Sequence, residues 1–400
     1  MERKKLTRYC EICGCNTGIV IHTQQFALNQ GNPLPVVCDY VICDECGFAF
    51  SDTAVDQAGY DSYYSGMSKY EDNATSTGAG VLPWDKSRLC DLADQVAAFC
   101  PNRASRIVDI GCANGGLLAA LRDKGFKNVC GIDPSPACVE TSRRLANGNA
   151  WVGTLSAVPL EAGSFDGVIL SHVMEHVRDL SAAMDLVHRL LNPGGWVYIE
   201  VPDASRYHKF LVAPFQDFNT EHINHFSEVS LANLCRRNSF VPEVGATKTI
   251  CSLQDMPYPA LFWFARKSET PLQIVTDRAL QSELGKYIAL SHNLMKRIGE
   301  NISRVMEEYS EIIIWGAGQL TMKLLSDTCL RTAKISAFVD GNPINQGKIL
   351  HGAKIIASSK ITAGDTPILV CSLINEASIL QTIRKLGLPN PVATLLKGKA

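Results

Sequence analysis

Short apolar runs rich in β-branched residues recur along the middle of the chain, and segments with helical spacing of apolar positions separate them. Runs of this length, bounded by glycine, proline or asparagine, are typical of buried strands. The predicted strands are residues 107–110, 129–133, 150–155, 163–170 (a turn and a strand) and 196–201. Strands that alternate with helices indicate an α/β fold with a doubly wound sheet.

The connection after the first predicted strand consists of small or turn-forming residues from Gly111 to Gly116. A strand that turns through small residues into a helix exposes backbone N–H groups where a ligand can approach closely. Asp133 ends the second predicted strand, where a carboxylate can accept hydrogen bonds from ribose hydroxyls. The pattern therefore predicts a nucleoside-binding cleft.

Two classes of ligand fit such a cleft. A dinucleotide site usually shows G-x-G-x-x-G. This chain reads D-x-G-x-x-x-G from Asp109 through Gly111 to Gly115, with Ala113 where a middle glycine would stand. The Asp109 carboxylate would repel a pyrophosphate, but it suits a cationic ligand that has no phosphate.

Four segments in order make the chain resemble class I S-adenosylmethionine-dependent methyltransferases. They are VDIGCANGG (108–116), GIDPS (131–135), FDGVILSHVMEHV (165–177) and LNPGGWVYIEVP (191–202). The resemblance implies a Rossmann-like methyltransferase core that binds S-adenosyl-L-methionine. Its binding residues would be Asp109, Gly111, Ala113, Gly115, Asp133, Thr154, Leu155, Ser171 and His172, with Thr154 and Leu155 beside the adenine. A Rossmann-like domain without this ligand is the alternative.

Six of the fifteen cysteines lie within residues 10–46. Four of them form two C-x-x-C pairs, each followed by glycine: Cys10 with Cys13, and Cys43 with Cys46. Four thiolates predict a structural zinc site that is closed to substrate. Redox chemistry or coincidence is the alternative, and Cys15 or Cys38 could replace a neighbouring ligand.

This segment resembles the zinc-binding domain that precedes the methyltransferase domain in sugar C-methyltransferases, including the stretch at 33–36, although the family's Pro-Leu-Ala element is missing. The resemblance spans essentially the whole chain and implies five parts. These are a zinc-binding module (1–55), a tyrosine-rich and helical linker or lid (56–100), a methyltransferase domain (101–265), a helical connector (266–309) and a Rossmann-like C-terminal domain (310–400).

Tyr60, Tyr63, Tyr64 and Tyr70 lie within eleven residues. Phenol groups can hydrogen-bond sugar hydroxyls or stabilise an enolate, but they can equally pack a linker on the core. The resembled family has a tyrosine-rich segment that lines the substrate pocket, so we expect one of Tyr60, Tyr63 and Tyr64 to stabilise an enolate. Residues 73–83 look like a loop that could serve as a lid.

His172, Glu175 and His176 have the order H-x-x-E-H, which occurs in one class of zinc protease. The strand-to-helix context and the absence of a further ligand motif argue against a metal at this place.

The segment 203–226 contains Glu221 and His222. Histidine takes a proton near neutral pH, and a neighbouring carboxylate can orient it; surface histidines in a loop are the alternative. The resembled family has a Glu-His pair here, followed by an aromatic residue, Phe and Ser, and its histidine is the expected base. This chain departs from that pattern at Asn219-Thr220, where Tyr-His is usual, and at His225, where tyrosine is usual.

Residues 311–319 read as another strand with a Gly-x-Gly turn, and residues 335–339 read as a second strand. They indicate a small Rossmann-like unit, which could hold the nucleotide diphosphate of the substrate or be purely structural.

The net charge of −2 gives no reason to expect a nucleic-acid or membrane partner, and no apolar run has the length of a membrane span. The N-terminus lacks the apolar core of a secretory signal, so we expect a cytoplasmic protein.

The resemblance implies C-methylation of a nucleotide-linked ketosugar through an enolate. Methylation of oxygen or nitrogen on another acceptor, and a non-catalytic binding protein, are the alternatives. The oligomeric state stays open.

Overall fold

The computed structural model describes residues 2–67, 78–146, 148–155, 157–251 and 256–399. Tyr70 and residues 73–77 of the predicted lid lie outside this part of the chain. The described chain forms two compact units. The first contains Met1–Ile21, Val41–Phe210 and Glu221–Glu283, and the second contains His22–Tyr40, Leu211–Thr220 and Leu284–Ala400. Two short internal segments therefore belong with the C-terminal third of the sequence.

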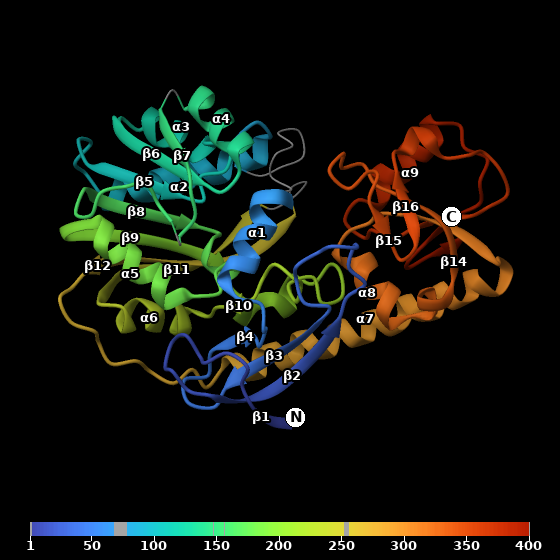
Figure 1. The fold of residues 1–400 in the computed structure, drawn as a ribbon, viewed down its shortest axis with the longest axis horizontal. Coiled ribbons are helices and arrows are strands. Elements are labelled where there is room, and N and C mark those ends of the chain that lie inside the picture. Colours follow the sequence, from blue (N-terminus) through green and yellow to red (C-terminus); the bar gives the residue numbers. More distant parts are fainter. Residues whose placement is uncertain (1, 68–77, 147, 156, 252–255, 400) are drawn as a thin grey trace. The chain divides into compact units, whose positions relative to one another are not determined.

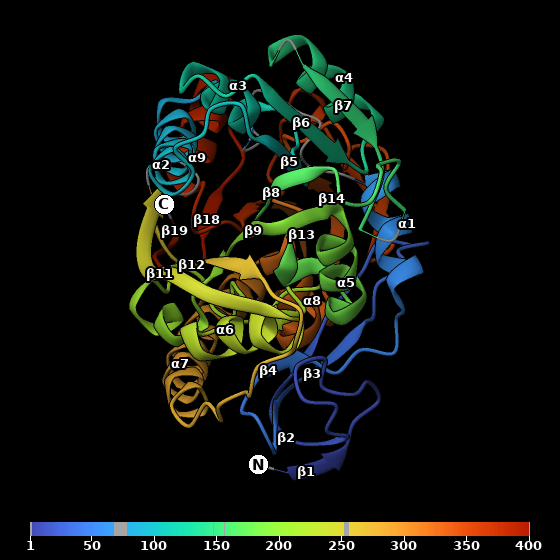
Figure 2. The ribbon, with the colours of Figure 1, turned by 90° about the vertical axis from the view of Figure 1, so that its left-hand side faces the viewer.

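The first unit is built on a seven-stranded sheet with the order β11-β12-β9-β8-β5-β6-β7, which can be followed in Figure 2. The strands are β5 (Arg106–Ile110), β6 (Asn128–Asp133), β7 (Asn149–Val152), β8 (Phe165–Ser171), β9 (Leu191–Pro202), β11 (Phe240–Cys251) and β12 (Pro257–Lys267). Strands β7, β6, β5, β8 and β9 are parallel to their neighbours, while β12 pairs antiparallel with both β9 and β11. The α/β prediction and the five predicted strands are confirmed.

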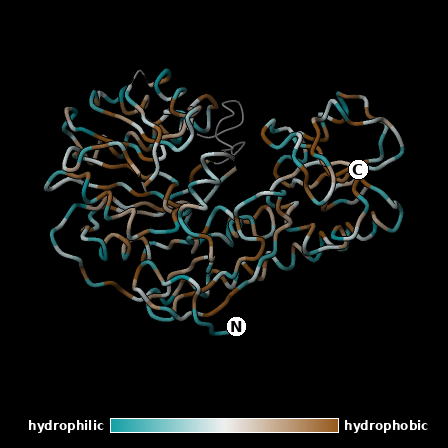
Figure 3. Tube along the Cα trace, in the orientation of Figure 1, coloured by the Kyte–Doolittle hydropathy of each residue, from teal (hydrophilic) through white to brown (hydrophobic). Residues whose placement is uncertain are grey.

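Alternate residues of the central strands face opposite sides of the sheet. Ile107 of β5 packs in one apolar cluster with α2 and α3, whereas the next residue, Val108, packs in another with α5 and α6 (Figure 1). The helices are α2 (Pro83–Phe99), α3 (Gly116–Asp123), α4 (Pro136–Leu145), α5 (Leu180–Leu190) and α6 (Glu228–Arg237). In Figure 3 many strand segments are coloured as hydrophobic and many connecting loops as hydrophilic.

A second sheet with the order β1-β2-β3-β4-β10 joins the N-terminal residues to a distant segment. Its strands are β1 (Glu2–Lys5), β2 (Thr17–Gln25), β3 (Val37–Cys43), β4 (Ala49–Ser51) and β10 (Asn224–His225). Asn224 of β10 pairs antiparallel with Phe50 of β4. The segment that carries Glu221 and His222 is therefore anchored to the cysteine-rich module.

The described part of the first unit also contains further helical segments. The tyrosine-rich stretch forms helix α1 (Gln57–Met67), and two 3-10 helices follow β8 and β9, namely η2 (Met174–His176) and η3 (Ala204–Lys209). Of the predicted helical connector, residues 280–308 are helical, as α7 (Leu280–Glu308).

The second unit contains its own sheet with the order β15-β16-β14-β13-β17-β18-β19. Its strands are β13 (Glu311–Trp315), β14 (Lys334–Val339), β15 (Ile349–Leu350), β16 (Ala353–Ile356), β17 (Ile368–Val370), β18 (Val392–Thr394) and β19 (Gly398–Lys399). Its helical segments include α8 (Gln319–Asp327), η5 (Cys329–Thr332), η6 (Ser358–Lys360) and α9 (Glu376–Lys385). Strands β16, β14, β13, β17 and β18 are parallel to one another, as in a Rossmann-like sheet.

Among the helices of the described residues, none combines the length and apolar character needed to cross a membrane.

Candidate active site

The residues predicted to bind the cofactor meet at one edge of the first sheet. Asp109 is the fourth residue of β5, Asp133 ends β6, the turn with Thr154 follows β7, and Ser171 ends β8. These four strands are parallel, so their carboxyl ends share one edge. Ligands of open α/β sheets bind at this edge.

The loop after β5 is fastened to the end of β6 by Asp133. The backbone N–H of Ala113 donates to Oδ2 of Asp133 at 2.9 Å, and that of Ser135 donates to Oδ1 at 2.9 Å. A carboxylate accepts about four hydrogen bonds, so holding the loop and binding a ribose are compatible roles. Gly111 has a φ of +84°, and a Cβ there would lie 2.5 Å from the side chain of Val173. Glycine is therefore required for the close packing of this loop.

Asp109 and Ser171 test whether this edge fits S-adenosylmethionine. Burial, and then the charge of Asp133, raise the pKa of Asp109 to about 7, against a smaller opposing effect of Arg88. A cationic ligand would stabilise the ionised carboxylates, because opposite charge favours the charged form of an acid. The buried Oγ of Ser171 has no hydrogen-bond partner among the described residues. The edge thus offers negative charge and a polar group in need of a partner, as a sulfonium nucleoside requires.

Thr154 and Leu155, the residues predicted beside the adenine, lie in the turn after β7. The Thr154 hydroxyl donates to Oδ2 of Asp61 in α1 at 3.4 Å, and Leu155 packs against the apolar cluster that contains Val108. Their contact with adenine stays a prediction.

His172 lies between two buried carboxylates. Its Nδ1 is 3.1 Å from Oε1 of Glu175, and its Nε2 is 3.2 Å from Oε1 of Glu200. Burial alone would lower the pKa of His172, but these two carboxylates raise it to about 9. Lys248 of β11 also pairs with Glu200. The sequence indicated His172 but not Glu200 or Lys248, which come from β9 and β11.

Four of the predicted catalytic residues come together beside His176. The Tyr63 hydroxyl donates to Oε1 of Glu221 at 3.4 Å, and the Tyr64 hydroxyl lies 2.9 Å from Nδ1 of His176. The rings of His176 and His222 have centroids 4.9 Å apart and meet edge to face. The structure therefore groups Tyr63, Tyr64, Glu221 and His222.

Tyr60, the remaining predicted catalytic tyrosine, is fully buried. Its catalytic role stays a prediction.

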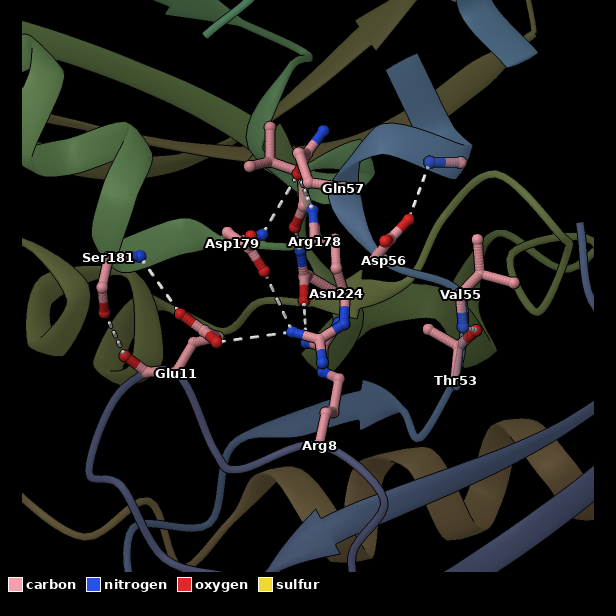
Figure 4. A network of polar contacts seen from close by, with 12 residues as sticks. Arg8, Glu11, Thr53, Val55, Asp56, Gln57, Arg178, Asp179, Ser181 and Asn224 are labelled. Carbon is pink, nitrogen blue, oxygen red and sulfur yellow. Dashed lines mark hydrogen bonds and ion pairs between the residues drawn. The ribbon is translucent and has the colours of Figure 1, made fainter. Parts of the chain in front are cut away.

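Asn224 holds the segment that carries His222. Its Nδ2 donates to the carbonyls of Met174 at 2.9 Å and Val177 at 2.7 Å, on both sides of Glu175 and His176. Its Oδ1 accepts from Nη2 of Arg8 at 2.6 Å, as Figure 4 shows. No local sequence signal links Arg8 to Asn224, because 216 positions separate them.

The four predicted zinc ligands also come together. Their sulfur atoms all lie within 4.8 Å of one another: Cys10, Cys13, Cys43 and Cys46. Cys10 Sγ is 3.5 Å from Cys46 Sγ, and Cys13 Sγ is 3.4 Å from Cys43 Sγ. Four soft thiolates in this arrangement suit a tetrahedral zinc ion. Cys15 instead contacts Thr17.

The parallel strands, the glycine-containing loop and the acid at the end of β6 are those of a Rossmann-like domain that binds a nucleoside. Residues 84–243 match a family model described as a methyltransferase domain, so this part of the chain is an S-adenosylmethionine-dependent methyltransferase domain.

Two curated relatives illustrate the similarity. The chain is 34% identical over 103 residues to a ubiquinone biosynthesis O-methyltransferase of Methylocella silvestris. The aligned region covers 24% of this chain and 40% of that protein. Over 125 residues it is 30% identical to an uncharacterized methyltransferase of Mycobacterium tuberculosis, which covers 31% of this chain and 51% of that protein. The chain spans about half the length of these relatives or less.

Among solved structures, an S-adenosylmethionine-dependent methyltransferase of Methanosarcina mazei is 20% identical, with a TM-score of 0.36 and coverage of 43% of this chain and 95% of that chain. One from Mesorhizobium loti is 21% identical, with a TM-score of 0.36 and coverage of 45% and 100%.

Proposed function

We propose that the protein transfers a methyl group from S-adenosylmethionine to a nucleotide-linked sugar, at the carbon beside a ketone. The observation that carries this proposal is the position of Glu175 and His176 directly after β8, with Glu221 and His222 beside them. Groups able to move a proton therefore lie next to the carboxyl end of β8, at the same edge of the sheet as the cofactor loop after β5. The bound cofactor supplies a methyl group on a positively charged sulfur. Asp133 would hold its ribose, and Asp109 would favour its charge.

The acceptor carbon must lose a proton before it can attack the methyl group. His222 would take this proton, assisted by Glu221. Tyr63 and Tyr64 would donate hydrogen bonds to the enolate oxygen that then carries the charge. The electron pair on carbon would form the new C–CH3 bond while the pair of the breaking C–S bond remains on sulfur. Holding the two reacting atoms in line would supply much of the rate.

O-methylation is a second candidate, because one relative is named an O-methyltransferase. The same groups would then remove a hydroxyl proton. To separate the two, the protein is incubated with methyl-labelled cofactor and a panel of nucleotide-linked sugars with and without a ketone. A labelled product that resists demethylation of ethers and shows a methyl carbon bonded to carbon by NMR supports the first candidate. A methyl ether supports the second, and no labelled product on any sugar overturns both.

We also propose that the four clustered thiolates hold a structural Zn²⁺. This proposal is supported by their spacing in the sequence and by the proximity of the four sulfur atoms. The ion would stabilise a small segment and would take no part in methyl transfer.

Separately, we propose that the Gly316-Ala317-Gly318 turn of the second unit binds a nucleotide. The backbone N–H of Ala317 donates to Oδ2 of Asp340 at 3.0 Å, so this loop is tied to the end of the neighbouring strand, as the loop of the first unit is. A strand-to-helix turn of this kind suits a phosphate or a ribose.

A further inference from the structure

Glu175, His176 and His222 form a second group of metal-ligand side chains in the first unit. One ligand atom of each lies within 4.8 Å of the others. Two imidazoles and one carboxylate are the donor set that binds a divalent cation while leaving coordination positions open. The sequence argued against a metal here because no further ligand motif follows the H-x-x-E-H order. The fold brings a third ligand side chain to this place from His222, 46 positions beyond His176.

The carboxylate of Glu175 has one oxygen in use and one in need of a partner. Its side chain is 1% exposed, and Oε1 is held by His172 at 3.1 Å. Oε2 is buried and makes no hydrogen bond within the described part of the chain. A buried carboxylate oxygen without a partner is costly, and a bound cation would remove that cost.

His176 is oriented as a metal ligand would be. Its Nδ1 lies 3.0 Å from the backbone carbonyl oxygen of Glu221. A carbonyl can only accept, so a neutral imidazole that bonds to it carries its proton on Nδ1, and the Tyr64 hydroxyl, 2.9 Å from the same nitrogen, then accepts as well. The lone pair is then on Nε2, which lies 3.9 Å from Oε1 of Glu175. A histidine whose Nδ1–H is bonded to a backbone carbonyl while Nε2 meets the metal is the usual arrangement in metal sites.

We propose that Glu175, His176 and His222 bind a divalent cation whose open positions take an oxygen of the acceptor. The part that concerns the acceptor rests on the proposed methyl transfer. Two ligand atoms that are each about 2.1 Å from one ion, with a right angle at the ion, are about 3 Å apart. The distances between the present ligand atoms, which are at most 4.8 Å, would therefore shorten by less than about 2 Å. Side-chain rotation can supply that movement.

The cation would change the roles of the neighbouring groups. It would stabilise the negative charge on the acceptor oxygen when the proton leaves. His222 would be a ligand, and the proton would pass to the carboxylate of Glu221, which Tyr63 contacts at 3.4 Å. The acceptor's electron pair would then form the bond to the methyl carbon, and the C–S bond would break toward sulfur.

This site is chemically distinct from the four-thiolate cluster. Nitrogen and oxygen donors accept Mn²⁺, whereas thiolates select softer ions such as Zn²⁺. Mn²⁺ is therefore a probe for this site in the full-length protein, and its paramagnetic resonance signal reports binding without any need for activity.

The test is a titration of the protein with Mn²⁺, followed by electron paramagnetic resonance, on the wild type and on Glu175→Gln, His176→Asn and His222→Asn. His351→Asn is the matched control, because His351 lies in the second unit and is exposed. We expect one Mn²⁺ per wild-type chain and per control chain, and affinity at least about tenfold weaker in each of the three variants. Absence of binding to the wild type, or equal binding by all three variants, overturns the proposal.

Calorimetric titration with S-adenosylmethionine on the same samples separates the two proposals and shows that each variant is folded. Cofactor binding without Mn²⁺ binding would remove the metal site and leave methyl transfer standing. Mn²⁺ binding without cofactor binding would overturn the proposed function and leave the cation site.

Discussion

Ala317 donates its backbone N–H to Oδ2 of Asp340 at 3.0 Å, and in the first unit Ala113 donates to Oδ2 of Asp133 at 2.9 Å. In both places the other carboxylate oxygen, Oδ1, accepts a hydrogen bond from the backbone N–H two residues after the aspartate, which is that of Ser135 or Asn342. The chain thus contains the same loop-to-acid contact twice, at the ends of parallel strands in two different sheets. This repetition allows one acid to serve as the control for the other.

Asp133→Asn removes a charge and an acceptor from the first of these contacts. We expect the affinity for S-adenosylmethionine to fall by roughly 10–100-fold, because hydrogen bonds to charged groups contribute about 1.5–3 kcal/mol. Asp340→Asn should leave that affinity within about twofold and instead weaken binding of a nucleoside diphosphate sugar. Isothermal calorimetry with both ligands on both variants measures this. Equal loss of cofactor affinity in the two variants would contradict the assignment.

Asp109 should make cofactor binding depend on pH. Its pKa in the folded protein is raised to about 7, so below that pH the carboxyl is largely protonated. A cationic ligand favours the ionised form, so affinity should rise as the pH increases through about 7, with release of a proton. Calorimetry in two buffers that differ in ionisation enthalpy detects the proton. Asp109→Asn should bind without proton release, and a wild type that releases none would refute this role.

The same carboxyl should also affect stability. Between its ordinary pKa near 4 and about 7 the folded protein holds a proton that the unfolded chain has lost. The free energy of unfolding therefore falls as the pH rises across this window, by on the order of 1–4 kcal/mol for this group. Urea unfolding of the ligand-free protein at several pH values measures the slope. Asp109→Asn should show a less negative slope than the wild type, and identical slopes would exclude the effect.

Tyr63→Phe tests whether the phenol that contacts Glu221 acts in catalysis. Loss of the hydroxyl removes the hydrogen bond at 3.4 Å. We expect kcat to fall by roughly 100-fold or more, as for removal of one positioned hydrogen-bond donor to a developing oxyanion, with cofactor affinity unchanged. Tyr9→Phe is the matched control, because Tyr9 is exposed. Single-turnover rates and cofactor titrations distinguish an effect on chemistry from an effect on folding.

Arg8→Met tests the support of the segment that carries His222. Arg8 is buried, and its loss would leave Oδ1 of Asn224 without its partner at 2.6 Å. We expect kcat to decrease by roughly 10–100-fold through misplacement of the groups near the acceptor, while cofactor affinity changes little. Arg144→Met, an exposed substitution on α4, serves as the control. If both variants retain wild-type kcat, the segment does not depend on Arg8.

Cys43→Ser should remove the metal of the N-terminal module. We expect the zinc content per chain to fall toward zero and the melting temperature to drop, because binding of a structural ion is coupled to folding. Metal analysis and thermal unfolding measure the two effects. Cys15→Ser is the control, since Cys15 contacts Thr17 rather than the cluster, and its zinc content should not change.

The core of the first unit was predictable because its strands have simple patterns. Ile107 and Val108 are both fully buried, so β5 reads as a continuous apolar run. The hairpin of β11 and β12 was not predicted. Strand β11 exposes most of its residues and therefore has no apolar pattern to read. The grouping of residues 22–40 and 211–220 with the C-terminal third depends on long-range contacts, which local patterns do not encode.

The candidate site was predictable only as far as its residues belong to short motifs. Spacing placed Asp109 and Asp133 at neighbouring strand ends, and paired the cysteines. Spacing did not predict the contact of His176 with His222, or the contacts of Glu200 with His172 and Lys248. Those contacts follow from the order of the strands in the sheet. Glu221 and His222 were found through resemblance to a family rather than through any physical pattern.

Because β4 pairs with β10, removal of the cysteine-rich module would disturb the segment that carries His222. A shortened protein that starts at residue 84, where the methyltransferase match begins, would lose Ser51, whose N–H donates to the carbonyl of Ile223 at 2.9 Å. It would also leave Asn224 and His225 on an open sheet edge. Chimeras that exchange acceptor preference between related enzymes should therefore carry both pieces from the same parent.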